Sequence, residues 1–574
     1  MTNDEISDIL RNIGLLLELK GDNLFKTRAY QNGARAIDGM SEPVAQLVAA
    51  GTLADVDGFG KALVEKITTL VEAGSLPYYE NLKAEFPDGI LDLLSLNGLG
   101  PKKAKTLYQK LKIGSLEELQ TACESGKVAE LDGFGKKTAE KLLEAIQQQQ
   151  LYAGRFRYAE VIQQAEDLVD MMRTHPDITR ISIAGSLRRG KEVVKDIDLV
   201  ASSNNPQQVM QDFVSLPEVQ SITNHGETKS SVRVENGLQV DLRVVDDATF
   251  PTALHHFTGS MEHNVALRSR ARKRKMKISE WGLFDTSGQE EKLIPCRDEA
   301  EFFSHLDLDY IPPELRENMG EVEAAEKQTL PRLVDWGEFH GCFHNHTTAS
   351  DGKNTLREMA EAAASIGLDY LGIADHSKSS VQANGLSTDR LLAQVEEIRQ
   401  LNQEMEGEIH LFAGVECDIL KDGSLDYPDK ILEQLDYVVA SVHSSFTQSE
   451  KDQTQRICQA MANSHVTMLG HVTGRLLLER EAYAVNVQEI IQQAAKTETW
   501  IELNASPYRL DMDWRHWKAA RDTGVKCVIN PDAHRVQQLG HLKPAAMIAR
   551  KGWLRKEDVM NCLTLDQMKR ILKK

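Results

Sequence analysis

Beyond residue 337 the sequence alternates short apolar segments with longer amphipathic ones, and this repeat limits the possible folds more than any other feature. Short apolar segments separated by helical patterns are typical of parallel strands joined by crossover helices. The predicted strands are 341–343, 370–374, 410–415, 437–442, 466–469, 500–503 and 527–529. Seven such strands predict a parallel barrel, in which the carboxyl ends of the strands form the rim that carries catalytic residues.

Histidines and acids follow the predicted strands at this rim. They are His344, His346, Asp375, His376, Glu416, His443, His471, Asp532 and His534. A single histidine is more often a hydrogen-bonded polar group than a ligand, but converging imidazoles and carboxylates are ligands of Zn²⁺ and Mn²⁺. Two or three such cations hold a hydroxide nucleophile and stabilise the charge of a phosphoester transition state. The pattern therefore predicts a metal-dependent phosphoesterase.

A turn at residues 185–190 has the features of an anion site. The strand-like run 181–184 leads into Gly185 and Ser186, so free backbone N–H groups are expected in the turn. Arg188 and Arg189 follow and are expected to face outward. Together these groups predict a cradle for phosphate.

Three acids accompany this turn. Asp196 and Asp198 lie two residues apart in a predicted strand, so both carboxylates project from one face, and Asp241 lies in what reads as a neighbouring strand. Adjacent carboxylates repel each other unless a cation lies between them, which predicts Mg²⁺. An Asp-x-Asp pair alone more often belongs to a surface hairpin without catalytic function. With the Gly-Ser turn upstream, the two-metal scheme of nucleotidyl transfer is favoured.

Three Gly-x-Gly hairpins occur within the first 150 residues, and each precedes an amphipathic helix. Their glycines are Gly58 and Gly60, Gly98 and Gly100, and Gly133 and Gly135. A hairpin that opens a helix exposes unpaired N–H groups at the positive end of the helix dipole. These groups can bind a DNA backbone phosphate without recognising a base. One hairpin could be an ordinary helix-helix turn, but three favour DNA binding.

Through Gly-Ser-Leu-Arg-Arg-Gly at 185–190, the chain resembles the family X DNA polymerases of the nucleotidyltransferase superfamily, and the hairpins resemble helix-hairpin-helix motifs. The first segment also resembles the lyase domain of DNA polymerase beta. That resemblance implies that Lys66 forms a Schiff base with a 5′-deoxyribose phosphate and that Lys26 and Tyr30 are its neighbours. Phe25 stands where the family has a histidine. Such an amine needs a lowered pKa, and a solvated lysine on a helix face is equally compatible with the sequence.

The same resemblance implies that the incoming nucleotide is bound by Arg155, His256, Phe257, Gly259, Asn264 and Arg268. In the family, the position of Arg155 reaches the triphosphate, and the aromatic pair before Thr-Gly-Ser packs on the sugar. The positions of Asn264 and Arg268 face the minor groove of the nascent pair and its template. His256 replaces the tyrosine of animal relatives, which bears on the exclusion of ribonucleotides.

Residues 338–574 resemble the polymerase and histidinol phosphatase (PHP) family in motifs such as His344-Asn345-His346 and Asn530-Pro531-Asp532-Ala533-His534. The resemblance implies three metal positions. The first would be held by His344, His346, Glu416 and Asp532, the second by Glu416, His443 and His471, and the third by Asp351, His376 and His534. Because every ligand position is filled, the site is predicted to be active.

These features predict a multidomain architecture. It comprises a helical lyase-like DNA-binding domain at 1–85, a fingers-like helix-hairpin-helix domain at 86–153, an α/β nucleotidyltransferase palm at 154–250, a thumb at 251–318, a linker at 319–337 and a distorted (β/α)7 PHP barrel at 338–574. The linker is expected because the segment is acidic and follows a proline pair, and such segments seldom build cores.

The predicted function is template-directed gap filling during base excision or end repair, with a 3′–5′ exonuclease or 3′-end phosphoesterase in the barrel. The expected partners are gapped or nicked DNA and deoxynucleoside triphosphates, with two Mg²⁺ in the palm and up to three Mn²⁺ or Zn²⁺ in the barrel. A net charge of −19 argues against indiscriminate nucleic-acid binding but permits local basic surfaces. The cysteines form no Cys-x-x-Cys pair, and the sequence shows neither a signal peptide nor a membrane span. A monomeric, nucleoid-associated protein of the bacterial cytosol is expected.

Two alternatives remain open from the sequence. In one, the chain is a PHP phosphatase for a small phosphate ester and the palm is inactive. In the other, it is a non-catalytic platform that binds DNA ends. The three hairpins argue against the first alternative, and the intact carboxylates at both sites argue against the second.

Overall fold

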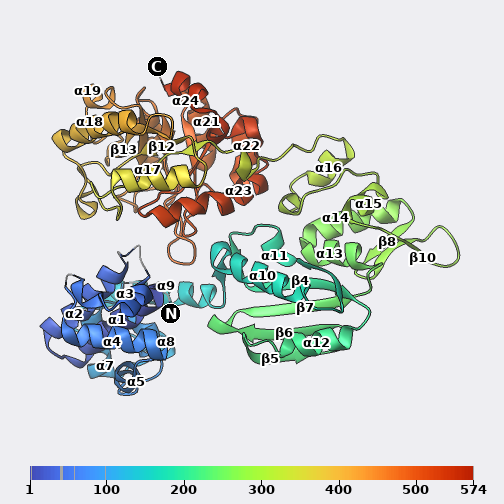
Figure 1. Cartoon of the computed structure of the whole chain (residues 1–574), viewed down its shortest axis with the longest axis horizontal. Coiled ribbons are helices and arrows are strands. Elements are labelled where there is room, and N and C mark those ends of the chain that lie inside the picture. Colours follow the sequence, from blue (N-terminus) through green and yellow to red (C-terminus); the bar gives the residue numbers. More distant parts are fainter. Residues whose placement is uncertain (2, 39, 41–42, 57, 97, 573–574) are drawn as a thin grey trace. The chain divides into compact units, whose positions relative to one another are not determined.

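The computed structural model describes the chain except residues 2, 39, 41–42, 57, 97 and 573–574, and divides it into two compact units, Met1–Ala153 and Gly154–Lys574 (Figure 1). Asp57 and Asn97, which belong to two of the predicted hairpins, lie outside the described residues.

The first unit is helical. Its helices are α1 (Asn3–Lys20), α2 (Leu24–Asp38), α3 (Val44–Ala50), α4 (Lys61–Ala73), α5 (Pro77–Lys83), α6 (Ile90–Ser95), α7 (Pro101–Leu111), α8 (Leu116–Glu124) and α9 (Gly135–Tyr152). Ile6, Leu10 and Ile13 are fully buried, as their helical spacing predicts. Gly60 and Gly100 directly precede α4 and α7, and Gly135 begins α9, so each predicted hairpin opens a helix.

The palm is a five-stranded mixed sheet with the strand order β2-β4-β7-β6-β5. Its strands are β2 (Ile178–Ile183), β4 (Asp196–Ser203), β5 (Val219–His225), β6 (Lys229–Val234) and β7 (Gln239–Val245), and β1 (Phe156–Arg157) pairs separately with β3 (Val193–Val194). The strands β4 and β7 are parallel neighbours.

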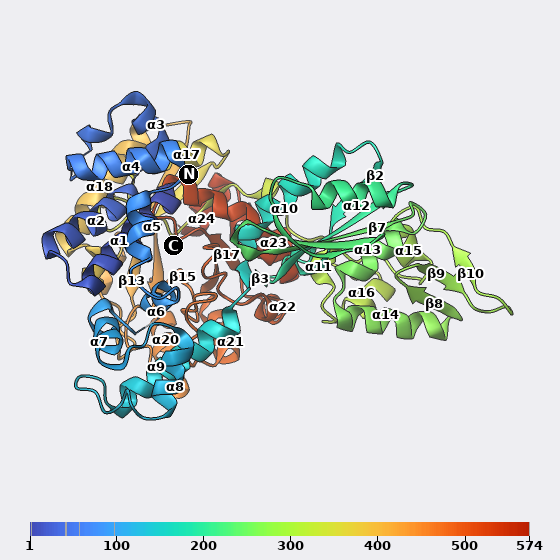
Figure 2. The same cartoon turned by 90° about the horizontal axis from the view of Figure 1, so that it is seen from below.

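Side-chain alternation divides the residues of β4 between two faces of the palm sheet. Leu199 and Ala201 pack with helices α10 (Tyr158–Arg173) and α12 (Pro206–Val214), whereas Val200 on the other face packs against α13 (Phe250–Thr258) (Figure 2). Asp196 and Asp198 share the face of Val200. The acids therefore lie on the face toward α13 and not in the core covered by α10 and α12.

The thumb follows with α13, α14 (Met261–Lys273), the antiparallel strands β8 (Met276–Ser279), β9 (Gly282–Asp285) and β10 (Lys292–Ile294), and α15 (Glu299–Ser304). The segment 319–337 is packed, contrary to the linker prediction. Its helix α16 (Glu321–Glu326) places Val322 and Ala325 in the hydrophobic cluster of the thumb. Glu321 is fully buried because its Oε1 lies 2.7 Å from His263 Nδ1, so pairing allows an acidic stretch to join a core.

The barrel contains seven parallel strands in sequence order, as predicted. They are β11 (Gly341–Cys342), β12 (Tyr370–Ile373), β13 (His410–Asp418), β14 (Tyr437–Ser441), β15 (Met468–Leu469), β16 (Trp500–Asn504) and β17 (Cys527–Asn530). A parallel bridge between Asn345 and Ala533 links the residues that follow β11 and β17, so the ring is nearly closed. The surrounding helices are α17 (Leu356–Ser365), α18 (Thr388–Glu404), α19 (Asp429–Leu432), α20 (Glu450–Met461), α21 (Val487–Thr497), α22 (Trp514–Asp522), α23 (Leu542–Lys551) and α24 (Leu565–Leu572).

Candidate metal centres

The three predicted palm acids converge. The parallel register of β4 and β7 places Asp198 directly beside Asp241, and Asp196 lies two residues before Asp198 on the same face. Burial, together with the neighbouring Asp196 and Asp241, raises the pKa of Asp198 to about 7. Oxygen ligands that repel one another in this way fit Mg²⁺, because a divalent cation between them removes the repulsion.

Two polar partners of Asp241 were not anticipated from the sequence. Lys229 Nζ lies 2.9 Å from Asp241 Oδ2, and Gln239 Nε2 donates to Asp241 Oδ1 at 2.9 Å. Lys229 lies on the neighbouring strand β6 and Gln239 on the same strand as the acid, but a single lysine or glutamine in a strand carries no signal of a catalytic site. Lys229 supplies part of the positive charge that the carboxylates require.

The phosphate turn packs tightly against these acids. Gly185 begins the short helix α11 (Gly185–Arg188) with φ +63°, and a Cβ at this position would overlap the Asp198 carboxylate. Only glycine therefore permits this approach of the turn to the acid. Arg155 lies just before β1, whose pairing with β3 brings this segment to the strand that leads into Asp196.

The prediction that Arg188 and Arg189 face outward is wrong. Arg188 donates to Glu299 at 2.7 Å and to Thr258 Oγ1 at 2.8 Å. Arg189 donates through Nε to Glu317 at 2.9 Å. Both guanidinium groups turn toward the thumb because two glutamates distant in sequence pair with them.

The residues proposed to select the nucleotide form one cluster on α13 and α14. Asn264 Nδ2 donates to the carbonyl oxygen of His256 at 2.8 Å, and Arg268 Nη2 lies 3.3 Å from His256 Nδ1. The Phe257 ring stacks under the guanidinium of Arg243 at 4.2 Å. Gly259 follows α13 with φ +72°, next to Arg189.

In the barrel, the predicted ligands lie at the carboxyl ends of the strands. His344 and His346 follow β11, His376 follows β12, His443 follows β14, His471 follows β15, and Asp532 and His534 follow β17. Glu416 differs from the prediction because it lies inside β13, which continues to Asp418. His344 and Asp532 have φ values of +57° and +52°, a left-handed conformation that is rare for residues other than glycine and that clusters at functional sites.

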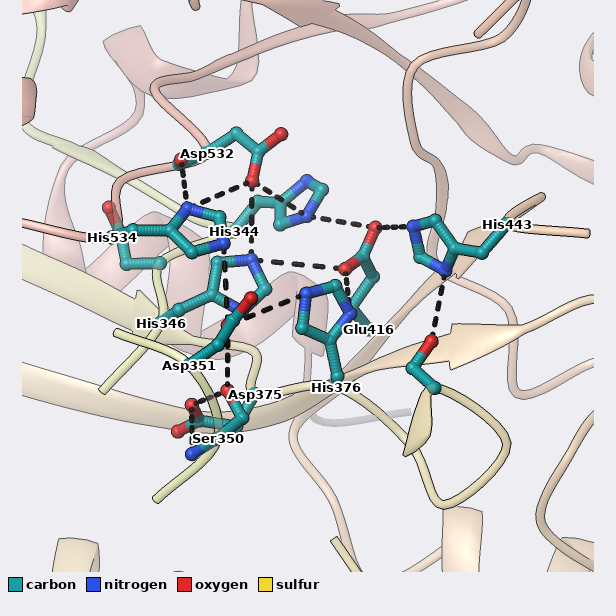
Figure 3. Close-up of polar contacts among 12 residues, drawn as sticks. His344, His346, Ser350, Asp351, Asp375, His376, Glu416, His443, Asp532 and His534 are labelled. Atoms are coloured by element: carbon teal, nitrogen blue, oxygen red, sulfur yellow. Dashed lines mark hydrogen bonds and ion pairs between the residues drawn. The ribbon is translucent and has the colours of Figure 1, made fainter. Parts of the chain in front are cut away.

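Glu416 lies at the centre of the barrel ligands (Figure 3). His344 Nε2 and His346 Nε2 are 3.2 Å and 3.8 Å from its carboxylate, and they are 3.7 Å and 3.2 Å from Asp532 Oδ1. His443 Nε2 and His471 Nε2 lie 3.1 Å and 2.9 Å from Glu416 Oε1. These four imidazoles therefore converge on one carboxylate.

A further group lies beside this centre. Asp351 Oδ1 is 3.6 Å from His376 Nε2 and 3.4 Å from His534 Nε2. His376 Nδ1 is in turn 2.8 Å from Glu416 Oε2, which connects the two groups. The structure thus brings together each of the three ligand sets that the resemblance implied.

Unsatisfied buried atoms indicate that these groups fit metal ions. Nε2 of His344, Nε2 of His346 and Oε2 of Glu416 are buried and make no hydrogen bond, although atoms of other candidate ligands lie close to each of them. Buried polar atoms are normally paired, since an unpaired one costs free energy. Ligand atoms of His344, His346 and Glu416 lie within 4.8 Å of one another, and imidazole with carboxylate suits Zn²⁺ or Mn²⁺.

Several acids that the sequence did not single out hold the ligands in place. Glu502 in β16 lies 2.5 Å from His344 Nδ1 and accepts the His471 backbone N–H at 2.9 Å. Asp418 Oδ1 is 3.0 Å from His443 Nδ1. Acids that orient metal-binding histidines in this way also set their tautomers. The sequence does contain one indication of this role, because Glu502 is an acid within the otherwise apolar predicted strand 500–503.

In the first unit, Lys66 on α4 packs against aromatic rings. Its Nζ lies 4.9 Å from the centre of the Tyr78 ring and 6.0 Å from that of Tyr30. Lys26 Nζ is 5.5 Å from the same Tyr78 ring, so the structure brings together the three residues predicted at this site. Phe25 is 81 % exposed beside them.

Comparisons with known proteins agree with this architecture. Family models described as a helix-hairpin-helix domain, a SAM-like helix-hairpin-helix tandem, a DNA polymerase beta thumb and a PHP domain match residues 1–76, 90–148, 253–317 and 343–506. The chain is 39 % identical over 576 residues to "DNA polymerase/3′-5′ exonuclease PolX" of Bacillus subtilis (strain 168), with 100 % of both chains covered. The chain belongs to the PolX family.

Other relatives of this PolX-family chain match the barrel. A "probable phosphatase" of Thermoanaerobacter sp. (strain X514) is 26 % identical over 229 residues, which covers 38 % of this chain and 88 % of the relative. A "probable phosphatase" of Clostridium acetobutylicum is 25 % identical over 233 residues with the same coverage. Among the described residues, no helix has the length and apolar character needed to cross a membrane.

Proposed function

We propose that this PolX-family chain fills short gaps in DNA during repair with its palm and removes nucleotides from 3′ ends with its barrel. The observation that carries the proposal is the presence of two separate candidate metal centres in one chain, three acids in the palm and nine ligands in the barrel. The B. subtilis relative is named for both activities. The DNA 3′ end would be the substrate shared by both sites, and the deoxynucleoside triphosphate would be a substrate of the palm alone.

In the palm, Asp196, Asp198 and Asp241 would hold two Mg²⁺ ions. When bound, these ions lower the pKa of the primer hydroxyl and neutralise the charge of the leaving pyrophosphate. Ser186 and the N–H groups of its turn would bind the triphosphate together with Arg189. Arg188, paired with Glu299, would fix the turn to the thumb.

Nucleotide selection is assigned to the thumb cluster. His256 and Phe257 would pack on the sugar at the turn that contains Gly259, while Asn264 and Arg268 would face the nascent pair. Arg155 would add a contact to the triphosphate. The hydrogen bond from Asn264 to the His256 carbonyl oxygen supports a fixed arrangement of this cluster.

In the barrel, the three ligand sets would hold up to three Mn²⁺ or Zn²⁺ ions, which supply a hydroxide nucleophile and stabilise charge on the phosphoester. The residues of the chain orient this site. Glu502 and Asp418 fix the rings of His344 and His443 so that Nε2 of each faces Glu416. Burial of Glu416, which is 1 % exposed, keeps bulk water from its carboxylate.

Primer extension on a gapped duplex tests this division of labour. The double variant Asp196→Ala/Asp198→Ala should abolish extension and leave 3′ degradation unchanged. The double variant His344→Ala/His346→Ala should do the reverse. If either pair removes both activities from a folded chain, the assignment of two independent sites is wrong.

The barrel relatives named as probable phosphatases support a second candidate function, hydrolysis of phosphate monoesters. DNA with a 3′-phosphate end and p-nitrophenyl phosphate distinguish the substrates. Faster turnover of the small ester than of any DNA end would favour a phosphatase. If neither is hydrolysed and no extension occurs, a non-catalytic DNA-end platform would be the better interpretation.

The first unit would hold the DNA through the hairpins at Gly58–Gly60, Gly98–Gly100 and Gly133–Gly135. Lys66 is proposed as the nucleophile of a 5′-deoxyribose phosphate lyase, supported by its position beside Lys26 at Tyr78. Borohydride trapping on such an end should be lost in Lys66→Ala and kept in Lys61→Ala. We further propose that the chain acts as a monomer on nucleoid DNA in the bacterial cytosol.

A further inference from the structure

Arg189 occupies a position between two turns of the proposed nucleotide site. It follows the Ser186 turn in sequence, and its Nη1 donates to the backbone carbonyl oxygen of Thr258, just before Gly259. Its side chain is largely buried, and Nε donates to Glu317 Oε1 at 2.9 Å. A guanidinium held by a carboxylate in this way has its charge neutralised, which would weaken its attraction for a triphosphate.

The same oxygen of Glu317 also accepts a hydrogen bond from the barrel. Lys551, the last residue of α23, donates through Nζ to Glu317 Oε1 at 2.6 Å. Lys551 is 1 % exposed, and it also donates to the backbone carbonyl oxygen of Arg189 at 3.0 Å. A buried lysine of the hydrolase half therefore contacts both the arginine of the nucleotide turn and the carboxylate that pairs with it.

The charges of this cluster sum to one positive charge. Arg189 and Lys551 are cations, and Glu317 is the anion between them. Burial lowers the pKa of Lys551 to about 8, so it remains protonated at pH 7. Burial acts to raise the pKa of Glu317, but Lys551 and Arg189 outweigh it and lower that pKa, so the glutamate is ionised.

We propose that Lys551 is a positioning residue of the polymerase site. By sharing Glu317 Oε1, it leaves Arg189 with positive charge for the triphosphate and anchors the backbone of the turn. In addition to its own hydrolytic site, the barrel then contributes a positive charge to the nucleotide site of the palm. The inference rests on the proposed polymerase function and names a residue outside the palm and thumb that determines nucleotide affinity.

A purely structural role for Lys551 as a clamp between the two halves predicts different behaviour. Other contacts already join them, because Trp514 Nε1 donates to Glu192 at 2.9 Å and Arg550 Nε donates to Glu314 at 2.6 Å. Loss of one lysine amine leaves these contacts in place. A clamp would affect stability and both activities, whereas an electrostatic role would affect the KM for nucleotide.

The test measures gap filling by the full-length chain against nucleotide concentration. Lys551→Met should raise the KM for nucleotide roughly tenfold, because one unit charge near the triphosphate is lost, while kcat changes less than about twofold. Degradation of 3′ ends should be unchanged. Lys543→Met, on the exposed face of the same helix, is the matched control and should leave all three quantities unchanged.

Rescue variants separate charge from shape. Lys551→Arg should retain the wild-type KM, and Lys551→Met combined with Glu317→Gln should restore it, since the net charge of the cluster returns to one. If Lys551→Met does not fold, Glu317→Gln alone, which raises the net charge of the cluster to two, should lower the KM for nucleotide, and an unchanged KM there overturns the proposal. An unchanged KM in Lys551→Met, or no recovery in the double variant, overturns the proposal. If the wild-type chain itself does not fill gaps, the proposed polymerase function fails instead.

Discussion

The palm and the barrel assemble metal ligands in opposite ways. In the palm, Asp198 and Asp241 come from two adjacent strands, and the positive charge near them comes from Lys229 and Arg243. In the barrel, ligands follow or lie in six strands and are held by further acids such as Glu502. On the proposed assignment, substrate phosphates would complete the palm site, whereas the barrel site would be preorganised by the chain itself.

The largest expected effect tests the preorganised site at its centre. Glu416→Gln removes the carboxylate that five imidazoles contact, so 3′ degradation should fall by a factor on the order of 10³ while gap filling changes less than about twofold. Release of labelled nucleotide from the 3′ end measures the loss. The exposed Glu408→Gln is the control. Retained degradation would show that Glu416 is not the shared ligand.

The palm should be sensitive to the packing of the backbone against its acids as well as to the loss of the acids themselves. Gly185→Ala inserts a methyl group into the Asp198 carboxylate, so gap filling should fall by roughly 100-fold, the scale expected for a displacement of about 1 Å at a reacting centre. Single-nucleotide insertion kinetics measure this effect. Gly237→Ala has similar backbone strain, with φ +77° but open space around it, and should retain activity. Equal losses in both variants would indicate strain alone.

A smaller effect is expected from the residues that brace the barrel ligands. Glu502→Gln removes the charged partner of His344, so Mn²⁺ affinity should fall roughly 10- to 100-fold. Binding of Mn²⁺ followed by electron paramagnetic resonance measures this without reference to activity. The exposed Glu489→Gln should bind as the wild type does. Unchanged affinity in Glu502→Gln would mean that the site does not depend on its bracing acids.

The smallest effect on either activity is expected at Glu299, at the junction of palm and thumb. A substitution there should change the free energy of unfolding. Burial alone would raise the pKa of Glu299, but Arg316 and Arg188 lower it to about 2. Its contribution to the free energy of unfolding should therefore be complete above about pH 4.5 and be lost as the pH falls toward 2. Glu299→Gln should lower the free energy of unfolding by about 3–5 kcal/mol at pH 7, because it leaves the buried Arg316 and the half-buried Arg188 without their carboxylate.

Urea unfolding at several pH values measures this difference. The gap between the wild type and Glu299→Gln should shrink as the pH decreases from 5, whereas the exposed Glu290→Gln should follow the wild type throughout. A gap that stays constant down to pH 3 would contradict the proposed ion pairing.

The sequence predicts those features that depend on local alternation. Asp196 and Asp198 share a face because side chains alternate along β4, and the barrel histidines meet because parallel strands end at one rim. Long-range pairing was not predictable. The direction of Arg189 depends on Glu317, 128 residues away, and on Lys551, which is more distant still. No local pattern specifies such partners.

The burial of individual acids is not predictable from local sequence for the same reason. The stretch that begins at Glu321 is acidic enough to suggest a solvated linker, but His263 in α14 pairs with Glu321 and makes its burial favourable. The role of Glu502 is not predictable from its own segment, because its partner His344 lies 158 residues earlier in the chain.

The hydrophobic cluster of the thumb includes a residue from the opposite end of the chain. Phe302 and Phe303 of α15, Leu333 of the connecting segment and Trp553 just after α23 belong to one buried group. A rotation of the thumb over a nucleotide must therefore carry the indole of Trp553 with it or expose that ring to water. Opening and closing of the thumb would then displace Trp553 and couple this motion to the adjoining helix α23 of the barrel.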